Sequence, residues 1–320
     1  MTPYYTAWLG GIALQNTCGK GKAKQGRCCK ANRNQETSCV ERQMKKTCRT
    51  EKTIPEISGQ EGSMQISPGA AEASRRTPEN GSGLKKLYSG KTKDVFLQED
   101  GNVLLYFKDA VTGTEGRIDS GGNEVIGEVA GKGNASFRLT LYFFALLQKA
   151  GIPTHFLETG PKENTIIVRS ARSFNLEVIC REKAWGSFVR RYGQYVEEGK
   201  PLPSLVEFTL KDDMRGDPLI TEDALVALGI VSRETVDYMK DTAEKATAVI
   251  KNDLAARGLE LIDIKYEFGE VDGQAVIIDE VSGDSMRVAK DGKVLLQKEL
   301  AAAILGDKLN YDFFGFSFEL

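Results

Sequence analysis

The chain has 320 residues, of which 41% are hydrophobic and 28% are charged, enough for one large domain or two ordinary ones with real cores. A net charge of −2 gives no reason to expect nucleic acid or an anionic membrane as the main partner. No apolar run reaches the ~18–20 residues that a transmembrane helix needs. The charge is unevenly spread: residues 1–83 carry 13 Lys and Arg and 7 Asp and Glu, whereas the remainder carries 30 and 38.

Residues 1–83 also differ from the rest of the chain in their side chains. Residues 9–83 contain no aromatic residue, and such a segment cannot bury enough apolar area to offset the entropy of ordering, so we predict a disordered basic extension. It holds five of the six cysteines: Cys18, Cys28, Cys29, Cys39 and Cys48. Three alternatives stay open: a metal-binding module without paired C-x2-C spacing, a transit peptide without serine in its first 35 residues, or a true start at Met64.

Cysteine usage also bears on the compartment. The remainder of the chain contains Cys180 alone and cannot form an internal disulfide, which indicates a reducing environment. We therefore predict a cytoplasmic protein, with organellar targeting by residues 1–83 as the alternative.

From residue 84 onward, short apolar runs alternate with glycine-containing turns, the pattern of antiparallel strands. The first strands are expected at residues 84–87, 94–97 and 103–107. A core helix is expected at residues 139–149, ended by Gly151 and Pro153. Further strands are expected at residues 165–169 and 176–181.

The second half mixes helices and strands. A helix is expected to start near Ser187, and Thr221 and Ser232 have the positions of N-caps, with the helix after Ser232 ending at Gly258. The last elements are a hairpin of residues 259–268 and 274–281 around Asp272-Gly273, and a helix at residues 296–305. Because no βαβ rhythm appears, the α+β class is favoured over a doubly wound sheet.

A glycine and two lysines between the first strands form a candidate phosphate-binding turn. Gly90 permits close approach of the backbone to a ligand, and Lys91 and Lys93 point to the same side of an extended chain. The alternative is a solvated hairpin tip.

Alternating carboxylates and apolar residues mark the predicted hairpin. Asp263, Lys265 and Glu267 share one face of the strand at residues 261–269, and Asp279 lies on its partner strand. Carboxylate oxygens suit Mg²⁺, so Glu267 and Asp279 are candidate ligands; the alternative is an ordinary amphipathic strand.

The turn of this hairpin sets a geometric condition on the metal site. A strict two-residue turn at Asp272-Gly273 would put Glu267 and Asp279 on opposite faces, whereas a three-residue or bulged turn would put them on one face. We therefore predict a bulged turn.

Four further features contain candidate functional residues. Arg287 ends a polar loop and offers a planar fork for an anion, or a surface salt bridge. Ser187 begins a helix that could hold an anion on free N–H groups, or it is a simple N-cap. Residues 211–218 form a charged loop that is either solvated or a mobile lid. His155, the only histidine, is expected to be structural rather than a metal ligand or general base, because no Cys or second His lies near it in sequence.

The order of these motifs resembles the SAICAR synthetase family over about residues 84–305. The motifs are Y-x-G-K-x-K-x-V/F, G-I-P-T-H-F, E-x-x-x-R-x-x-x-x-G-S, K-D-D-x-x-x-D-P, D-x-K-x-E-F-G and D-E-x-x-x-D-S-x-R. The chain departs from the family pattern at Gly283, where proline is usual, at Ala289, where tryptophan is frequent, and over residues 109–113. These departures concern local loop shape.

The resemblance implies a two-lobe α+β fold related to ATP-grasp and kinase-like folds, with ATP between an N-terminal lobe of residues 84–173 and a C-terminal lobe of residues 174–306. Residues 307–320 are a tail whose aromatic side chains suggest docking on a surface. By matching position, the implied ATP-binding residues are Gly90, Lys91, Lys93 and Lys265, and the Mg²⁺ ligands are Glu267 and Asp279. The implied substrate-binding residues are Arg181, Ser187, Lys211, Asp213, Asp217, Asp263 and Arg287, and the catalytic ones are Lys93, Asp263 and Lys265.

The resemblance also implies a carbon–nitrogen ligase of purine biosynthesis. ATP would phosphorylate the carboxylate of a carboxylated aminoimidazole ribotide, and the amine of L-aspartate would then displace phosphate. Positioning and charge neutralisation carry most of such a reaction, so lysines and Mg²⁺ suffice. The alternatives are a nucleotide-dependent kinase or ligase with another acceptor, or a catalytically silent binding protein. The expected partners are the small-molecule substrates, without nucleic acid or membrane, and a homo-oligomer stays open.

Overall fold

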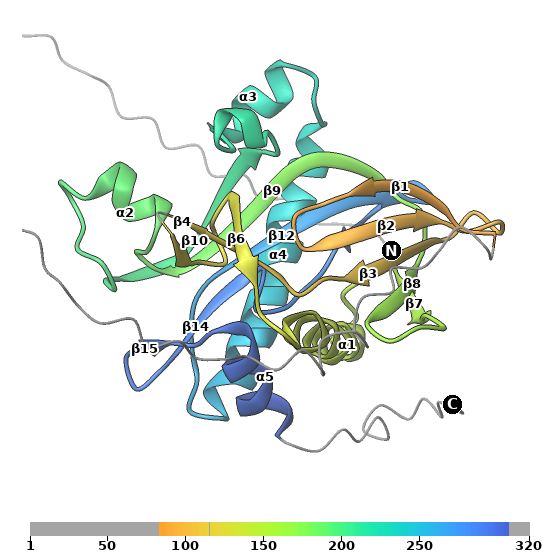
Figure 1. Cartoon of the computed structure of the whole chain (residues 1–320). Coiled ribbons are helices and arrows are strands. Elements are labelled where there is room, and N and C mark those ends of the chain that lie inside the picture. Colours follow the sequence, from red (N-terminus) through yellow and green to blue (C-terminus); the bar gives the residue numbers. More distant parts are fainter. Residues whose placement is uncertain (1–82, 115, 307–320) are drawn as a thin grey trace, which may run out of the picture. The chain divides into compact units, whose positions relative to one another are not determined.

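The computed structural model describes residues 83–114 and 116–306, which contain three β-sheets and five α-helices (Figure 1). Within each of these sheets, neighbouring strands are antiparallel. The α+β class predicted from the sequence is confirmed. The predicted extension of residues 1–83, except its last residue, and the predicted tail of residues 307–320 lie outside the described residues.

The N-terminal part of the described chain forms a five-stranded sheet. Its strands, in spatial order, are β1 (Lys85–Ser89), β2 (Lys93–Leu97), β3 (Val103–Phe107), β8 (Thr165–Val168) and β7 (Phe156–Thr159). The predicted meander is therefore confirmed. The turn between β1 and β2 is closed by the backbone N–H of Gly90, which donates to the carbonyl of Lys93 at 2.7 Å. This bond fixes the lysine-bearing turn against the sheet edge.

A small sheet follows that the sequence did not predict. It consists of β5 (Arg117–Ile118), β4 (Ala110–Thr114) and β6 (Glu124–Glu128). Residues 119–123 connect β5 to β6, and the N–H of Gly122 donates to the carbonyl of Asp119 at 2.9 Å. We call these five residues the 119–123 loop.

The largest sheet holds the remaining strands. Its order is β11 (Leu219–Ile220), β10 (Pro201–Leu210), β9 (Arg172–Lys183), β12 (Glu260–Val271), β14 (Met286–Lys290) and β15 (Lys293–Val294), and β13 (Gln274–Ile278) pairs with β12. The twelve residues of β12 are long enough to pair with β9 on one side and with both β14 and β13 on the other. β12 is thus the central strand of this sheet.

The helices are α1 (Lys132–Lys149), α2 (Ser187–Tyr192), α3 (Glu222–Ala227), α4 (Arg233–Ala255) and α5 (Gln297–Leu305), with a 3₁₀ turn at Asp213–Arg215. Both predicted N-caps are confirmed, because the hydroxyls of Thr221 and Ser232 accept hydrogen bonds from backbone N–H groups at 3.2 Å. None of the helices in the described part is long and apolar enough to cross a membrane.

Helix α1 begins seven residues before its predicted start at residue 139. Its N-terminus has no local capping side chain. Instead, the carboxylate of Asp109 accepts hydrogen bonds from the N–H groups of Gly131 and Gly133 at 3.1 and 2.8 Å. A cap supplied from 22 residues upstream leaves no local signal in the sequence, which explains the late predicted start.

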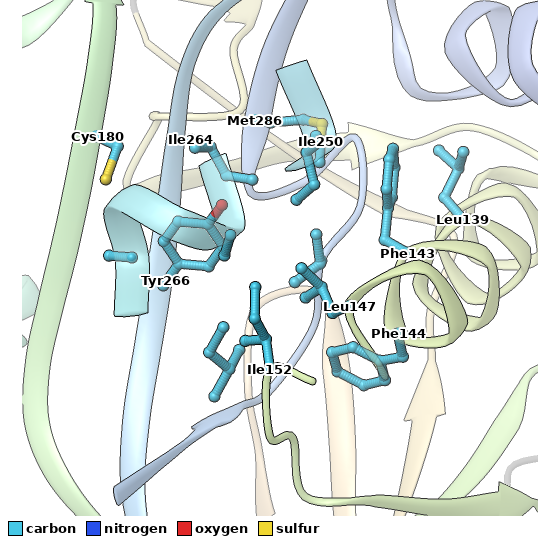
Figure 2. Close-up of a cluster of buried hydrophobic side chains, with 14 of the residues drawn as sticks. Leu139, Phe143, Phe144, Leu147, Ile152, Cys180, Ile250, Ile264, Tyr266 and Met286 are labelled. Atoms are coloured by element: carbon cyan, nitrogen blue, oxygen red, sulfur yellow. The ribbon is translucent and has the colours of Figure 1, made fainter. Parts of the chain in front are cut away.

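The core lies between α1, α4 and one face of the large sheet (Figure 2). Side chains of α1, including Phe143 and Leu147, pack with Ile264 and Tyr266 of β12. The phenol of Tyr266 lies 3.1 Å from the hydroxyl of Thr247 on α4, so this is the helix-covered face. As predicted, the side chains along this part of β12 alternate. Ile264 and Tyr266 point into the core, and the polar side chains between and beside them occupy the opposite, open face of the sheet.

Cys180 on β9 is completely buried in this core, and burial raises the pKa of its thiol to about 12. Because the thiolate is the reactive form, we expect iodoacetamide at pH 8 to alkylate Cys180 about 10³-fold more slowly in the folded protein than in urea. Peptide mass spectrometry over time measures both rates. Equal rates would contradict the burial of this side chain.

Candidate active site

Two adjoining cavities lie over the open face of the large sheet. The Lys93 cavity, of about 300 Å³, lies between the β1–β2 turn, strands β9 and β12, and the segment of residues 279–285 that follows β13. The Arg181 cavity, of about 120 Å³, extends along β9, β12 and β14 toward α2. The residues that line both cavities are Ser120, Asn123, Glu177, Lys265 and Ser285. The two cavities therefore share one wall.

Most of the predicted site residues divide between the two cavities by their predicted role. All predicted ATP-binding and metal-binding residues line the Lys93 cavity: Gly90, Lys91, Lys93, Lys265, Glu267 and Asp279. The predicted substrate residues that line the Arg181 cavity are Arg181, Ser187, Asp217, Asp263 and Arg287. Lys211 and Asp213, predicted as substrate residues, line the Lys93 cavity instead.

Lys93 is the most enclosed cation of its cavity, with 7% of its surface exposed. Its ammonium group pairs with Glu280 and lies 3.2 Å from a carboxylate oxygen of Asp279. Burial opposes its charge, but these two carboxylates outweigh burial and raise the pKa of Lys93. Burial raises the pKa of Glu280 to about 7, against the opposing effect of Lys93. Lys93 is thus a fixed cation at the floor of the cavity.

The hairpin that holds the two metal candidates has a strict two-residue turn, so the predicted bulged turn is wrong. Val271 pairs directly with Gln274, and both Asp272 and Gly273 have positive φ, at 52° and 79°. This is the turn type that Asp-Gly favours most strongly, because its twist matches that of the strands. Local turn chemistry therefore determines the register of the hairpin.

Glu267 and Asp279 nevertheless face the same cavity. Glu267 pairs with Ile278, so a continued β13 would direct Asp279 to the helix-covered face. Asp279 leaves the strand instead, with a left-handed φ of 67°, and its carboxylate joins Glu267 in the Lys93 cavity. Burial and the charge of Asp279 raise the pKa of Glu267, whereas Lys93 and Lys211 overcome the effect of burial and lower the pKa of Asp279.

The chemistry of this carboxylate pair fits Mg²⁺ bound together with a nucleotide. Across residues 83–114 and 116–306, no group of three or more His, Cys, Asp or Glu side chains gathers into a complete protein metal site. Mg²⁺ in nucleotide sites takes one or two carboxylates from the protein and completes its octahedron with phosphate oxygens and water. Glu267 and Asp279 supply that number.

The Arg181 cavity is built around a buried guanidinium. Arg181, with 2% of its surface exposed, donates to Glu207 at 2.6 Å, to Asp263 at 3.1 Å and to the hydroxyl of Ser187 at 3.0 Å. Ser187 is the first residue of α2, and Gly186 occupies the N-cap position, so Ser187 is not the simple N-cap considered above. Arg181 thereby ties β9 to β10, β12 and α2.

Arg287 forms the opposite side of the same cavity. Its guanidinium donates to Asp263 at 2.7 Å and pairs with Asp119 at 2.7 Å. Burial acts to raise the pKa of Asp119, but Arg287 outweighs it and holds that pKa below its usual range. Asp263 therefore lies between two arginines, and Arg287 is held from both sides with its fork in a fixed orientation.

The charged loop at residues 211–218 reaches over both cavities. Lys211 pairs with Glu267 at 2.6 Å, and Asp213 pairs with Lys91 at 2.7 Å, both over the Lys93 cavity. Asp217 accepts from the side-chain amide of Asn123 at 2.8 Å, beside the Arg181 cavity. The loop is thus tied to the β1–β2 turn, to β12 and to the 119–123 loop.

The sequence predicted no role for two components of the site: Glu177, the first residue of the E-x-x-x-R motif, and the 119–123 loop. Glu177 on the shared wall accepts from Lys265 at 2.6 Å and from Thr209 at 2.8 Å. The 119–123 loop supplies Asp119, and its Ser120 donates to the carbonyl of Gly283 at 2.6 Å. Glu177 stands opposite Glu267 across the β9–β12 ladder. No local pattern reveals such a pairing between strands more than 80 residues apart.

Gly121 gives a test of how closely the 119–123 loop approaches Arg287. A Cβ atom at this position would lie 2.1 Å from Nη2 of Arg287, so a methyl group must displace the guanidinium. We expect Gly121→Ala to raise the KM of the anionic ligand of the Arg181 cavity about tenfold, or about 1.4 kcal/mol. Steady-state kinetics measures this, and an unchanged KM for the ligand of the Lys93 cavity is the internal control. An unchanged KM for the ligand of the Arg181 cavity would mean that Arg287 does not contact this ligand.

Comparison with known proteins identifies relatives of this chain. A family model described as SAICAR synthetase matches residues 86–302. A phosphoribosylaminoimidazole-succinocarboxamide synthase of Clostridium tetani is 49% identical over 226 residues, which cover 69% of this chain and 100% of that protein. A synthase of the same name from Thermotoga petrophila is 42% identical over 223 residues, covering 69% of this chain and 92% of that protein.

Solved structures give the same result at the level of the fold. A SAICAR synthetase (Type-2) in complex with ADP superposes with a TM-score of 0.63 and 30% sequence identity, covering 70% of this chain and 99% of that chain. The range matched by the family model, residues 86–302, includes both cavities, since all their lining residues lie between residues 88 and 287.

Proposed function

Since the chain belongs to the SAICAR synthetase family and has its ligase activity in purine biosynthesis, we propose that the Lys93 cavity binds ATP and the Arg181 cavity binds the carboxylated aminoimidazole ribotide. The observation that carries this assignment is the sorting of the nucleotide-type and ribotide-type residues into two cavities with a common wall. A shared wall allows the reacting groups of two bound substrates to meet, which is the main requirement of group transfer.

On the nucleotide side, Gly90, Lys91 and Lys93 hold the phosphates. The β1–β2 turn brings a backbone free of Cβ and two ammonium groups to the cavity, and a solved relative binds ADP. Glu267 and Asp279 would hold Mg²⁺, which when bound neutralises phosphate charge and orients the transferring group. Lys91, paired with Asp213 here, exchanges that partner for phosphate oxygens.

On the ribotide side, Ser187 and Arg287 provide the donors for an anionic substrate. Arg181 and Asp263 are more deeply buried and hold these two groups in place while they line the cavity. Two fixed arginines allow an acidic domain to bind anions, because the guanidinium fork matches phosphate and carboxylate oxygens.

The reaction takes place at the shared wall. The γ-phosphoryl group passes to the imidazole carboxylate with release of ADP; the amine of aspartate then forms an amide with that carbonyl carbon, and the bond to phosphate breaks. Lys93 and Lys265 stay cationic because of their carboxylate partners and neutralise charge during transfer. Asp263 orients the ribotide through Arg287.

Aspartate enters beside the charged loop. Lys211, Asp213 and Asp217 offer charges of both signs, which suits a substrate with two carboxylates and one amine. Their bonds to Glu267, Lys91 and Asn123 would rearrange when the substrates bind, so the loop acts as a lid over the shared wall.

The domain organisation and location complete the proposal. The boundary between lobes at residues 173 and 174 falls near the start of β9, so one lobe carries the β1–β2 turn and the other carries β12 and its carboxylates. We place the enzyme in the cytoplasm, with small molecules as its partners, and the single cysteine of the described residues supports a reducing compartment.

An ADP-release assay with omitted substrates tests the function. Release that needs both aspartate and the ribotide is expected, together with amide product in equal amount. Release that needs the ribotide but not aspartate, and continues over many turnovers, would indicate a kinase that phosphorylates the ribotide without forming the amide, and release that needs neither would indicate another acceptor. If no ADP is released from ATP under any condition although the protein still binds ADP, the protein is a catalytically silent binding protein.

A further inference from the structure

Asp279 has a left-handed backbone conformation at the point where a continued β13 would direct its carboxylate to the helix-covered face, away from the Lys93 cavity. Its φ is 67°, whereas Ile277 and Ile278 before it follow the regular ladder. For a residue with a Cβ atom this conformation costs about 1–2 kcal/mol. Contacts around Asp279 must therefore favour the bend over a continued strand.

One of these contacts comes from His155. Its Nε2 atom lies 3.3 Å from the backbone carbonyl oxygen of Asp279. Because a carbonyl only accepts hydrogen bonds, the imidazole donates with its hydrogen on Nε2. The ring is 4% exposed and packs edge-on against Phe144, with ring centroids 6.0 Å apart at an angle of 88°. Its orientation is fixed by packing.

The backbone on either side of His155 is tied to the same strand. The N–H of His155 donates to the carbonyl of Ile277 at 3.0 Å, and the N–H of Ile277 donates to the carbonyl of Pro153 at 3.1 Å. The N–H of Arg169 donates to the carbonyl of His155 at 2.8 Å. Residues 153–155 therefore clamp the end of β13 from the side of the N-terminal sheet.

We propose that His155 is a positioning residue for the metal–nucleotide site, holding the Asp279 peptide so that the Asp279 carboxylate faces Glu267 and Lys93. This inference rests on the proposed metal role of Asp279. The hydrogen bond fixes the peptide plane that follows Asp279, and so also the start of the segment that carries Glu280 to Lys93. Without it, a continued strand would direct the carboxylate toward Ile277's side of the sheet, where the core lies.

Binding of ADP in the presence and absence of Mg²⁺ measures this role directly. The dissociation constant without Mg²⁺ divided by that with Mg²⁺, obtained by isothermal titration calorimetry on the full chain, reports how well the carboxylates engage the ion. We expect His155→Phe, which keeps a ring but lacks the donor, to reduce this ratio about tenfold. His155→Gln, which places an amide N–H near the Nε2 position, should restore it to within about threefold.

Two controls separate positioning from packing and from the metal assignment. Phe143→Leu loosens the same core at a ring that packs against Tyr142 rather than His155, and it should lower the melting temperature without changing the ratio. If His155→Phe does not fold, His155→Leu replaces it in the same comparison. An unchanged ratio in the variant without the donor, while Asp279→Asn reduces it, overturns the role of His155 alone. An unchanged ratio in Asp279→Asn overturns the metal assignment as well.

Discussion

Asp279→Asn is expected to lower kcat/KM for SAICAR formation by at least about 10³-fold while the protein stays folded. The substitution removes one of two carboxylates proposed to hold Mg²⁺ and half of the charge that faces Lys93. The backbone is preserved, because asparagine tolerates a left-handed φ as well as aspartate does. Coupled ADP release and circular dichroism measure the two parts of the expectation.

The chain offers a matched control for this variant. Asp272 stands at the tip of the same hairpin with a φ of 52°, is exposed, and lies outside both cavities. Asp272→Asn makes the same chemical change in the same kind of backbone, so its activity should stay within about twofold of the original. Similar losses in both variants would assign the effect to the hairpin rather than to a metal ligand.

Lys93→Ala is expected to abolish activity too, but it is the less informative change. Removing the ammonium group leaves Glu280 and Asp279 without their buried counter-charge. An unpaired buried charge destabilises a protein, so lost activity would mix catalytic and folding effects. Asp279→Asn avoids this because it removes a charge from the acidic side of the cluster.

Arg181→Met is expected to lower the free energy of unfolding by about 3–5 kcal/mol, the usual cost of removing one partner from a buried ion pair. Methionine fills much of the space of the arginine stem but leaves the carboxylates of Glu207 and Asp263 without this cation. Arg191 and Arg287 still reach these two carboxylates and limit the loss. Urea denaturation at pH 7 measures the effect.

Arg172→Met is the control for this second variant. Arg172 lies on the same strand and pairs with Glu270 at 2.6 Å, but its side chain is 68% exposed. Exposed pairs contribute at most about 1 kcal/mol, so this variant should be nearly as stable as the original protein. A loss below about 1 kcal/mol for Arg181→Met would mean that the Arg181 cavity is more hydrated than its burial indicates.

Local sequence signals located most of the elements. The strands of the first sheet, the N-caps Thr221 and Ser232, and the alternation along β12 each follow from side chains within a few residues. The start of α1 was missed because its cap, Asp109, comes from another part of the chain. Such predictions fail where a side chain accepts hydrogen bonds from backbone N–H groups that are distant in the sequence.

The candidate site shows the same division between features that local sequence signals indicate and features that only the tertiary structure brings together. The residue types in the motifs at Gly90–Lys93, at Asp263–Glu267 and at Asp279 indicated phosphate, carboxylate and metal chemistry before any geometry was known. Glu177 stood in the E-x-x-x-R motif without a predicted role, and the 119–123 loop carried no local signal. Only strand pairing and the small sheet bring them to the shared wall. The predicted turn was wrong because it assumed that Asp279 continued the strand.

By itself, then, the sequence determined the class of chemistry, the alternating carboxylate face of β12 and the family to which the chain belongs. These properties depend on residue type and spacing along one strand or turn. Only the tertiary structure decided which groups meet: that Lys93 pairs with Asp279 and Glu280, that Asp263 lies between two arginines, and that Glu267 and Asp279 share a cavity. The physical reason is that a left-handed φ at one residue reverses the direction of a side chain, and contacts from distant segments such as His155 accompany that φ.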